Sequence, residues 1–261
     1  FKARIKILVQ ETGVDKFCQL VEQEWAYIRD GALKLPESVV ARIETYFAPP
    51  EFEDLAGQPA RLGEFIESNP AFAAWTRRNV SAHRQVGYAI ATISLKPEGG
   101  IPGDVTAEQM DLIADLADRY SFGEVRTTHE QNLVLPHVRQ VDLMELWREL
   151  SAMELATANI SLVSDTICCP GLDYCGLATA RSIPVAQRLS ERFADLRRAE
   201  NIGELRLNIS GCINACGHHH VGHIGLLGVD KKNQEFYQIT LGGYGEYDAS
   251  IGRIIGPAVP S

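Results

Sequence analysis

The sequence predicts an α+β protein built from three consecutive parts. Residues 1–79 are expected to form a helical segment and a connecting arm, residues 80–150 a compact α+β unit, and residues 151–261 an α/β domain. Three observations support this division. Apolar residues recur at helical spacing near the N-terminus, one strand–helix–hairpin–helix pattern fills the middle, and helix and strand patterns alternate after it. With 45% hydrophobic and 23% charged residues, the composition is that of a globular protein, which excludes disordered and collagen-like classes.

The N-terminal part is predicted to be helical. Apolar residues fall near a 3.6-residue period over residues 2–30, and Gly13 interrupts the pattern. A shorter helix is expected after Pro36. Cys18 lies in the first helical stretch, where we expect it to be a small buried apolar residue. Residues 48–70 are rich in Pro, Gly and acidic residues, so they are expected to form the connecting arm.

The middle part carries clear local signals. Thr106, with Gln109 three residues later, is typical of a capping box at the start of a helix. The expected elements are a strand, a helix, two hairpin strands and a closing helix, at residues 86–95, 106–120, 124–128, 132–135 and 141–153. A layer of about 70 residues buries little surface by itself, so we expect it to pack against a neighbouring layer.

The C-terminal part is expected to contain one long helix and three strands. The helix is predicted over residues 178–198 and the first strand over residues 204–209. Two further strands, at residues 224–229 and 236–241, are joined by a predicted hairpin turn. The remaining residues are rich in Gly and Pro and are expected to form a loop.

Five of the six cysteines lie in the stretch from Thr166 to Cys216, and four of them form two pairs. Cys169 and Cys175 are separated by five residues, and Cys212 and Cys216 by three. Two cysteine pairs brought together by a fold can supply the four thiolates that an iron–sulfur cluster needs. Either Cys168 or Cys169 could be the first ligand. Because Cys169 gives the five-residue gap and precedes a proline, we expect Cys168 to be a spectator.

Backbone groups near the cysteines are expected to favour an anionic cluster. The first pair precedes a predicted helix, whose N-terminus carries partial positive charge. The N–H groups of Gly171, Gly176 and Gly217 are candidate donors to the cluster, and glycines let the backbone approach closely.

Three other uses of the cysteines remain open from the residues alone. A zinc site is the strongest alternative, with tetrahedral ligands drawn from Cys212, Cys216, His218, His219, His220 and His223. A five-residue gap in the first pair is unusual for such a site. A disulfide between Cys212 and Cys216 and buried inert thiols are the other two alternatives.

Charge and hydropathy limit the partners. A net charge of −9 argues against nucleic acid and anionic lipid, because phosphate binding needs a basic face. The sequence has no apolar run long enough for a membrane span and no secretion signal, and it has uneven cysteine spacing. We therefore expect a cytoplasmic protein that uses cysteine for metal or redox chemistry. Because the chain begins with Phe1, we also expect it to be a piece of a longer protein.

Two segments together with the cysteine spacing resemble the sirohaem-containing sulfite and nitrite reductases. One is Asn-Ile-Ser-Gly-Cys-Ile-Asn-Ala-Cys-Gly at residues 208–217, which holds the second cysteine pair. The other is Arg-Thr-Thr-His-Glu-Gln-Asn-Leu at residues 126–133, which looks like the Arg-x-Thr-x-x-Gln-Asn-Leu motif of that family. The resemblance implies a ferredoxin-like half-module over residues 80–150, packed beside a cluster-and-sirohaem domain over residues 151–261. Residues 1–79 would then be the helical tail of a preceding domain.

The resemblance also implies two cofactors and their neighbours. Cys169, Cys175, Cys212 and Cys216 would hold a 4Fe-4S cluster, and Cys216 would also bridge to the sirohaem iron. Arg126, Gln131 and Asn132 would lie beside the sirohaem, and Asn214 would donate a hydrogen bond near the cluster. His129 and Glu130 stand at variable positions of the motif and are given no role.

By this resemblance the chain is the C-terminal part of an assimilatory enzyme that reduces sulfite to sulfide or nitrite to ammonia with six electrons, sulfite being slightly favoured. The implied partners are the N-terminal half of the same enzyme, a ferredoxin or flavoprotein electron donor, and the small anion substrate. The family's catalytic Lys and Arg residues lie mainly in the first half, so no catalytic acid or base is expected here. The alternative functions are a zinc-stabilised binding or scaffold module and an apo-fragment that is inactive without the N-terminal half.

Overall fold

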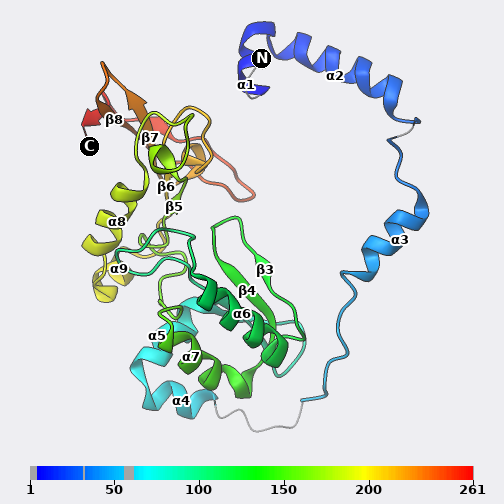
Figure 1. Ribbon diagram of the computed structural model, residues 1–261, viewed down its shortest axis with the longest axis vertical. Helices are drawn as coiled ribbons and strands as arrows, with labels where there is room; N and C mark the ends of the chain where they lie inside the picture. The colour runs from blue at the N-terminus through cyan, green and yellow to red at the C-terminus, as the bar shows by residue number, and fades with distance from the viewer. Residues whose placement is uncertain (1–4, 32, 56–61, 261) are drawn as a thin grey trace. The chain divides into compact units, whose positions relative to one another are not determined.

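The computed structural model describes residues 5–31, 33–55 and 62–260 (Figure 1). The chain divides into two compact units, Phe1–Phe52 and Glu53–Ser261. Within the described ranges, no helix is long and apolar enough to cross a membrane.

The first unit contains three helices among its described residues. They are α1 (Ile5–Thr12), α2 (Val14–Ile28) and α3 (Glu37–Thr45). Gly13, with φ of +79°, separates α1 from α2 as predicted. The expectation for Cys18 is wrong, because Cys18 is exposed and no residue of α2 is buried.

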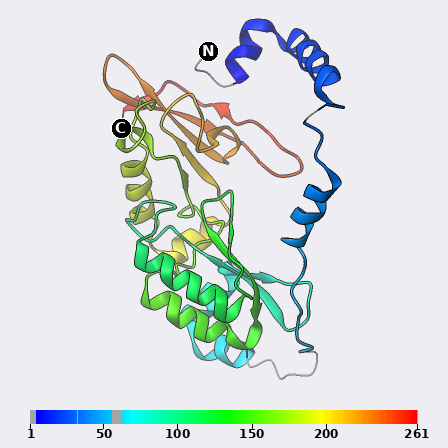
Figure 2. The same ribbon diagram turned by 45° about the vertical axis from the view of Figure 1, so that its right-hand side comes forward.

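The second unit begins with a four-stranded antiparallel sheet and four helices. The sheet has the order β1-β2-β4-β3. Its strands are β1 (Val80–Ala82), β2 (Tyr88–Ile93), β3 (Arg126–Thr127) and β4 (Leu133–Arg139). The helices are α4 (Leu62–Ser68), α5 (Pro70–Asn79), α6 (Ala107–Tyr120) and α7 (Leu143–Ala152), with the 3₁₀ turn η1 (Gln140–Asp142) before α7. Figure 2 shows α6 and α7 side by side. An ion pair of Arg119 with Glu149 joins the two helices.

The predicted capping box at the start of α6 is confirmed. The Thr106 hydroxyl accepts the Gln109 N–H at 3.2 Å, and the Gln109 side chain accepts the Thr106 N–H at 2.9 Å. The strand, helix, hairpin and helix predicted for residues 86–153 are also present, with ends that differ by a few residues.

The helix α5 corrects the expected role of residues 70–79. These residues were grouped with the helical tail, but Phe72 and Trp75 are fully buried in the core beneath the first sheet. Asn69 caps α5 by accepting the N–H groups of residues 71 and 72, and Pro70 occupies the first turn. The structure therefore places α5 in the half-module layer, and the chain divides near residue 52 instead of residue 79.

The second sheet of this unit carries the cysteines. Its order is β10-β8-β7-β6-β5, and β9 also pairs with β8. The strands are β5 (Ile167–Cys168), β6 (Leu207–Ser210), β7 (Ile224–Asp230), β8 (Glu235–Leu241), β9 (Arg253–Ile254) and β10 (Val259–Pro260). β5, β6 and β7 are parallel, and β8 is antiparallel to its neighbours. The strands β9 and β10 replace the expected C-terminal loop.

Two helices replace the single one predicted over residues 178–198. They are α8 (Ile183–Arg192) and α9 (Leu196–Ile202), and the 3₁₀ turns η2 (Gly171–Asp173) and η3 (His219–Val221) lie on either side of them in sequence. Asp195 starts α9 by accepting the N–H groups of Arg197 and Arg198, so the chain restarts at a capping residue. A periodic apolar pattern continues across this break, which explains the prediction of one helix.

The predicted hairpin between β7 and β8 is confirmed. Lys231 and Gln234 exchange backbone hydrogen bonds of 3.0 and 3.3 Å around a two-residue turn. The two turn residues, Lys232 and Asn233, have φ of +57° and +63°. Positive φ at both positions is the geometry of a type I′ turn, whose twist matches that of the flanking strands.

Candidate functional site

Both cysteine pairs follow the carboxyl ends of strands in the second sheet. Cys169 follows the last residue of β5 directly, and Cys212 lies two residues after the end of β6. The two strands are parallel neighbours, with Cys168 opposite Ile209. Since parallel strands end at a common edge, the sheet delivers both pairs to one place.

Backbone and sulfur atoms link the two cysteine loops. The Cys169 N–H donates to the Ile209 carbonyl at 3.1 Å, and the Gly211 N–H donates to the Cys169 sulfur at 3.0 Å. The Ser182 hydroxyl lies 3.5 Å from the same sulfur. An N–H group aimed at a buried sulfur is the arrangement that stabilises a ligating thiolate. The donor is Gly211, which the sequence did not indicate.

The loop that carries Cys175 packs tightly against Gly211. The Cys175 N–H donates to the Gly171 carbonyl at 2.8 Å, and the Ala180 N–H donates to the Gly211 carbonyl at 3.0 Å. A Cβ atom at position 211 would lie 2.8 Å from the Gly171 Cα and 2.7 Å from the Ala180 oxygen. Because those contacts are too short for a carbon atom, only glycine at position 211 lets the loops approach this closely.

The second pair spans a tight turn. The Ala215 N–H donates to the Cys212 carbonyl at 3.1 Å, and Ala215 has a φ of +57°. Cys212 is buried, whereas Cys216 is exposed. Gly217 was expected to donate to a cluster, but its N–H donates to the Ser210 hydroxyl at 3.1 Å. That prediction is therefore wrong for Gly217.

The donor set and the loop backbone fit an iron–sulfur cluster. Four of the six cysteines sit in the two linked loops. Across residues 5–31, 33–55 and 62–260, no three Cys, His, Asp or Glu side chains are gathered at metal-binding spacing. The fit therefore rests on the kind of ligand, the shared sheet edge and the N–H group of Gly211.

Cys168 differs from its neighbour Cys169. Its thiol donates to the Cys169 carbonyl at 3.2 Å. Burial first, and then the charges of Cys169 and Asp173, raise the pKa of the Cys168 thiol well above its usual range. A thiol that stays protonated is a poor metal ligand, which supports leaving Cys168 out of the ligand set.

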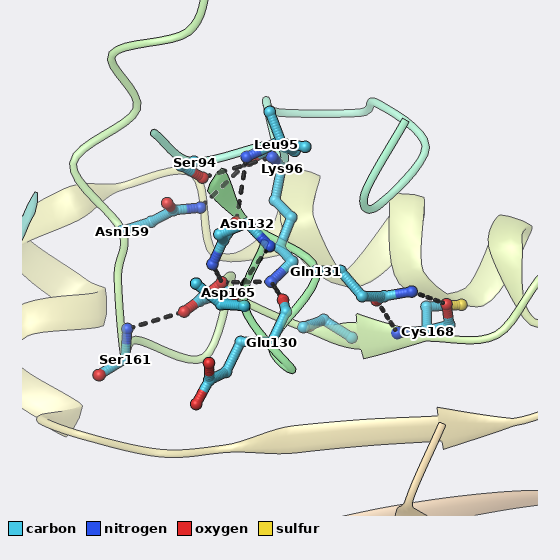
Figure 3. A network of polar contacts seen from close by, with 12 residues as sticks. Ser94, Leu95, Lys96, Glu130, Gln131, Asn132, Asn159, Ser161, Asp165 and Cys168 are labelled. Atoms are coloured by element: carbon cyan, nitrogen blue, oxygen red, sulfur yellow. Dashed lines mark hydrogen bonds and ion pairs between the residues drawn. The ribbon is translucent and has the colours of Figure 1, made fainter. Parts of the chain in front are cut away.

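Gln131 and Asn132 reach from the β3–β4 hairpin to the segment before Cys169 (Figure 3). The Gln131 carboxamide accepts the Cys168 N–H and donates to the Cys168 carbonyl, both at 2.8 Å. Asn132 is 3% exposed; it accepts the Leu95 N–H at 3.1 Å and donates to Asp165 at 3.0 Å. Both carboxamides, predicted beside sirohaem, thus bind protein atoms.

Asp165 is the centre of a buried polar network that the sequence did not indicate. Figure 3 shows the side chains of Lys96, Asn132 and Asp165 pointing toward one another. The Lys96 ammonium lies 2.5 Å from Asp165, and their side chains are only 2% and 5% exposed. Lys96 also donates to the Glu130 carbonyl, and the Ser161 N–H donates to the second Asp165 oxygen at 2.9 Å.

The network continues along the chain after Lys96. The Asn159 side chain donates to the Lys96 carbonyl at 3.1 Å. Lys96 and Asp165 lie 69 residues apart in sequence, and each stands in a mainly apolar run. A charged residue within such a run is a signal that it has a partner, but the sequence does not say which residue that partner is.

Arg126 keeps its head group near the surface. Its side chain is 55% exposed and pairs with Glu124, which also lies 3.1 Å from His137. Burial raises the pKa of Glu124, but the hydrogen bond and charge of Arg126 and the contact with His137 lower it overall. Burial lowers the pKa of His137, although Glu124 opposes this effect. His83 lies 3.1 Å from the other ring nitrogen of His137, so a polar chain leads to Arg126.

The remaining predicted site residues lie within or shortly after the second cysteine pair in sequence. Asn214 is half-buried in the turn between Cys212 and Cys216. The His223 ring accepts the Arg206 N–H at 3.1 Å and stacks on Tyr244, which leaves one ring nitrogen for any ligand role. His219 is buried and His218 is exposed.

The comparisons with known proteins place this arrangement in a family. A profile described as the nitrite/sulfite reductase ferredoxin-like half domain matches residues 85–153. The ferredoxin–nitrite reductase of Synechococcus elongatus is 30% identical over 262 residues, which cover 97% of this chain and 42% of that protein. The sulfite reductase [ferredoxin] 2 of Mycolicibacterium paratuberculosis is 27% identical over 261 residues, covering 97% of this chain and 40% of that protein.

The solved structure of the NirA protein of Mycobacterium tuberculosis matches with a TM-score of 0.61 at 25% identity. The match covers 99% of this chain and 42% of that one. Residues 85–153 thus match the ferredoxin-like half domain of the nitrite and sulfite reductases, and nearly the whole chain is similar to proteins of those names. The chain spans about two fifths of the length of these relatives.

Proposed function

We propose that this chain is the cluster-holding part of an enzyme that reduces nitrite or sulfite by six electrons. The observation that carries the proposal is the delivery of two cysteine pairs to one sheet edge, by two adjacent parallel strands. The comparisons support it, since a ferredoxin–nitrite reductase and a ferredoxin-dependent sulfite reductase both align along nearly the whole chain.

The proposal gives each cysteine a role. Cys169, Cys175, Cys212 and Cys216 would hold a 4Fe-4S cluster, and Cys216, which is exposed, would also bridge to sirohaem. When bound, the coupled cluster and sirohaem would transfer electrons from an external donor to the substrate. Gly211 directs its N–H at the Cys169 sulfur and so favours the thiolate.

Arg126 is the proposed contact to the sirohaem carboxylates. Its exposed guanidinium can form paired hydrogen bonds with a carboxylate, and Glu124 holds it in place meanwhile. Asn214 is the proposed hydrogen-bonding residue near the cluster, because it lies between two of the proposed ligands in sequence.

The surface beside the cysteine loops supports a protein partner, which we propose is the N-terminal half of the same enzyme. Apolar side chains next to the ligands are largely exposed: Tyr174 at 74%, Leu177 at 74% and Ile213 at 64%. An exposed apolar group around a redox site is typical of a contact surface.

Ferredoxin is the proposed electron donor. A cytoplasmic location is proposed because the uneven spacing of the cysteines favours metal or redox use over disulfides.

Iron and sulfide analysis tests the proposal. After anaerobic reconstitution, the chain is expected to bind about four irons and four sulfides and to show a broad visible absorption band. A Cys→Ser substitution at Cys169, Cys175, Cys212 or Cys216 is expected to abolish both the iron binding and the absorption band. Matched Cys168→Ser and Cys18→Ser variants are expected to retain the cluster, because these thiols lie outside the set.

The outcomes are distinct. Stoichiometric zinc without iron would instead identify a zinc-stabilised module, and equal iron loss in the Cys168 and Cys169 variants would overturn the ligand assignment. Adding the N-terminal half of the enzyme and measuring viologen-driven reduction of nitrite and of sulfite tests the activity and distinguishes the two substrates.

A further inference from the structure

The strand that leads into the first cluster cysteine has an unusual partner on its outer side. β5 is the terminal strand of its sheet and is paired with β6 only on one side. On the other side, the Gln131 side chain accepts the Cys168 N–H and donates to the Cys168 carbonyl. Both bonds measure 2.8 Å.

The two hydrogen bonds between Gln131 and Cys168 resemble those between neighbouring β-strands. A carboxamide carries one acceptor and one donor side by side, as a peptide group does, so it can satisfy both backbone groups of one edge residue. An unpaired edge leaves N–H and C=O groups open. Gln131 supplies at Cys168 what a further strand would supply.

The β3–β4 hairpin, which carries Gln131, also contacts Asp165, three residues before Cys168. Asn132, the next residue, donates to Asp165, which the buried Lys96 ammonium contacts as well. Two consecutive residues therefore hold both ends of the short segment 165–168 (Figure 3). Cys169 follows at once, with its N–H already bound to Ile209 of β6.

The backbone at Gln131 is shaped for this contact. Gln131 has a φ of +60°, which an L-residue adopts only when its surroundings require it. Gly103, at φ of +79°, lies beside it, where a Cβ atom would come within 3.0 Å of the Gln131 Cβ. A close glycine neighbour and a strained backbone both direct the carboxamide toward β5.

We propose that Gln131 is a positioning residue for Cys169. By closing the outer edge of β5 at Cys168, the half-module fixes where the first cysteine of the set leaves the sheet. The inference rests on the proposed function insofar as Cys169 is a cluster ligand. The contact itself is independent of any cofactor.

Amide hydrogen exchange at Cys168 tests the contact in the full chain without cofactors. Gln131→Met keeps the length of the side chain and removes both hydrogen bonds, so the Cys168 amide is expected to exchange about tenfold faster. His129→Ala changes the same hairpin at a side chain that is 82% exposed, and it is the matched control with unchanged exchange at Cys168. Equal exchange in Gln131→Met and the wild type would overturn the proposal.

Gln131→Glu supplies a readout that general destabilisation does not change. The introduced carboxylate can still accept the Cys168 N–H but repels its carbonyl, whereas the protonated carboxyl restores a donor. The variant-to-wild-type ratio of exchange rates is therefore expected to approach one at low pH and to rise as the pH increases. The same ratio for Gln131→Met is expected to stay constant. A constant ratio for Gln131→Glu would contradict the strand-like contact.

Iron loading connects the contact to the ligand. Gln131→Met is expected to incorporate cluster iron several times more slowly than the wild type and to alkylate faster at Cys169 in the apo chain, while His129→Ala matches the wild type. If the wild type binds no iron but exchange and alkylation change as expected, the cluster proposal fails and the positioning role stands. If iron binds normally and neither exchange nor alkylation changes, the positioning role fails alone.

Discussion

Replacing Asp165 with Asn removes one charge from the buried network and leaves its shape almost unchanged. The Lys96 and Asp165 side chains are 2% and 5% exposed and lie 2.5 Å apart. Breaking a buried pair leaves an uncompensated charge, which costs about 3–5 kcal/mol. For a domain of this size, that loss lowers Tm by about 10 °C.

The matched control is an exposed ion pair of the same unit. Arg148 and Glu145 lie 3.2 Å apart with side chains 60% and 59% exposed, so Glu145→Gln is expected to change stability by less than about 0.5 kcal/mol. Thermal and urea unfolding followed by circular dichroism measure both variants.

The double variant Lys96→Met with Asp165→Asn separates the pair from its surroundings. Because it removes both charges, it is expected to lose less stability than the two single variants together, with a coupling of about 2 kcal/mol. Equal shifts for Asp165→Asn and Glu145→Gln, or strictly additive single losses, would refute the reasoning that Asp165 is held by charge.

Three further outcomes are expected. Trp75→Ala, at a fully buried site in α5, should cost about 3–5 kcal/mol in urea unfolding, whereas Trp25→Ala, at a site 54% exposed, should cost less than about 0.5; similar losses would contradict the placement of α5. Burial lowers the pKa of His137, so its NMR titration midpoint should lie below its usual value of about 6.5, and stability should fall as the pH drops below about 6.5, a slope that His137→Gln removes. Lys232→Gly, at φ of +57°, should raise Tm by about 3 °C, and Asn233→Gly less; a decrease would contradict the type I′ turn.

The half-module and the cysteine-bearing sheet contact each other through polar atoms more than through a shared apolar core. The two buried apolar clusters are separate, one beneath the first sheet and one beside β6. Between them lie Asn132, Asp165 and the Gln131 contact to Cys168. Directional bonds fix a position more strictly than apolar contact does, which suits a segment that presents a metal ligand.

Features with local causes were predicted well. The capping box of Thr106 and Gln109 and the hairpin turn at Lys232 and Asn233 depend on residues a few positions apart. Their side chains and φ angles therefore follow from the nearby sequence. The helix α5 was missed although Asn69 and Pro70 form a recognisable start, because the composition before it favoured a loop.

The spacing of the cysteines predicted a ligand set but not the hydrogen bonds that hold the cysteine loops in place. Gly217 was expected to donate toward a cluster and donates to Ser210 instead, while Gly211 donates to the Cys169 sulfur. Gln131 and Asn132 were expected beside sirohaem, and their carboxamides bind Cys168 and Asp165. Arg126, the third residue expected beside sirohaem, has its charged group at the surface.

By itself, the sequence determined the α+β character, most of the strand and helix pattern, the two cysteine pairs and the motif of the family, because each is written in neighbouring residues. Only the tertiary structure decided that α5 belongs to the half-module, that Lys96 and Asp165 meet across 69 residues, and that Gln131 closes the edge of β5. The physical reason is that a buried donor, acceptor or charge requires a partner, but which partner it finds depends on how distant strands pack.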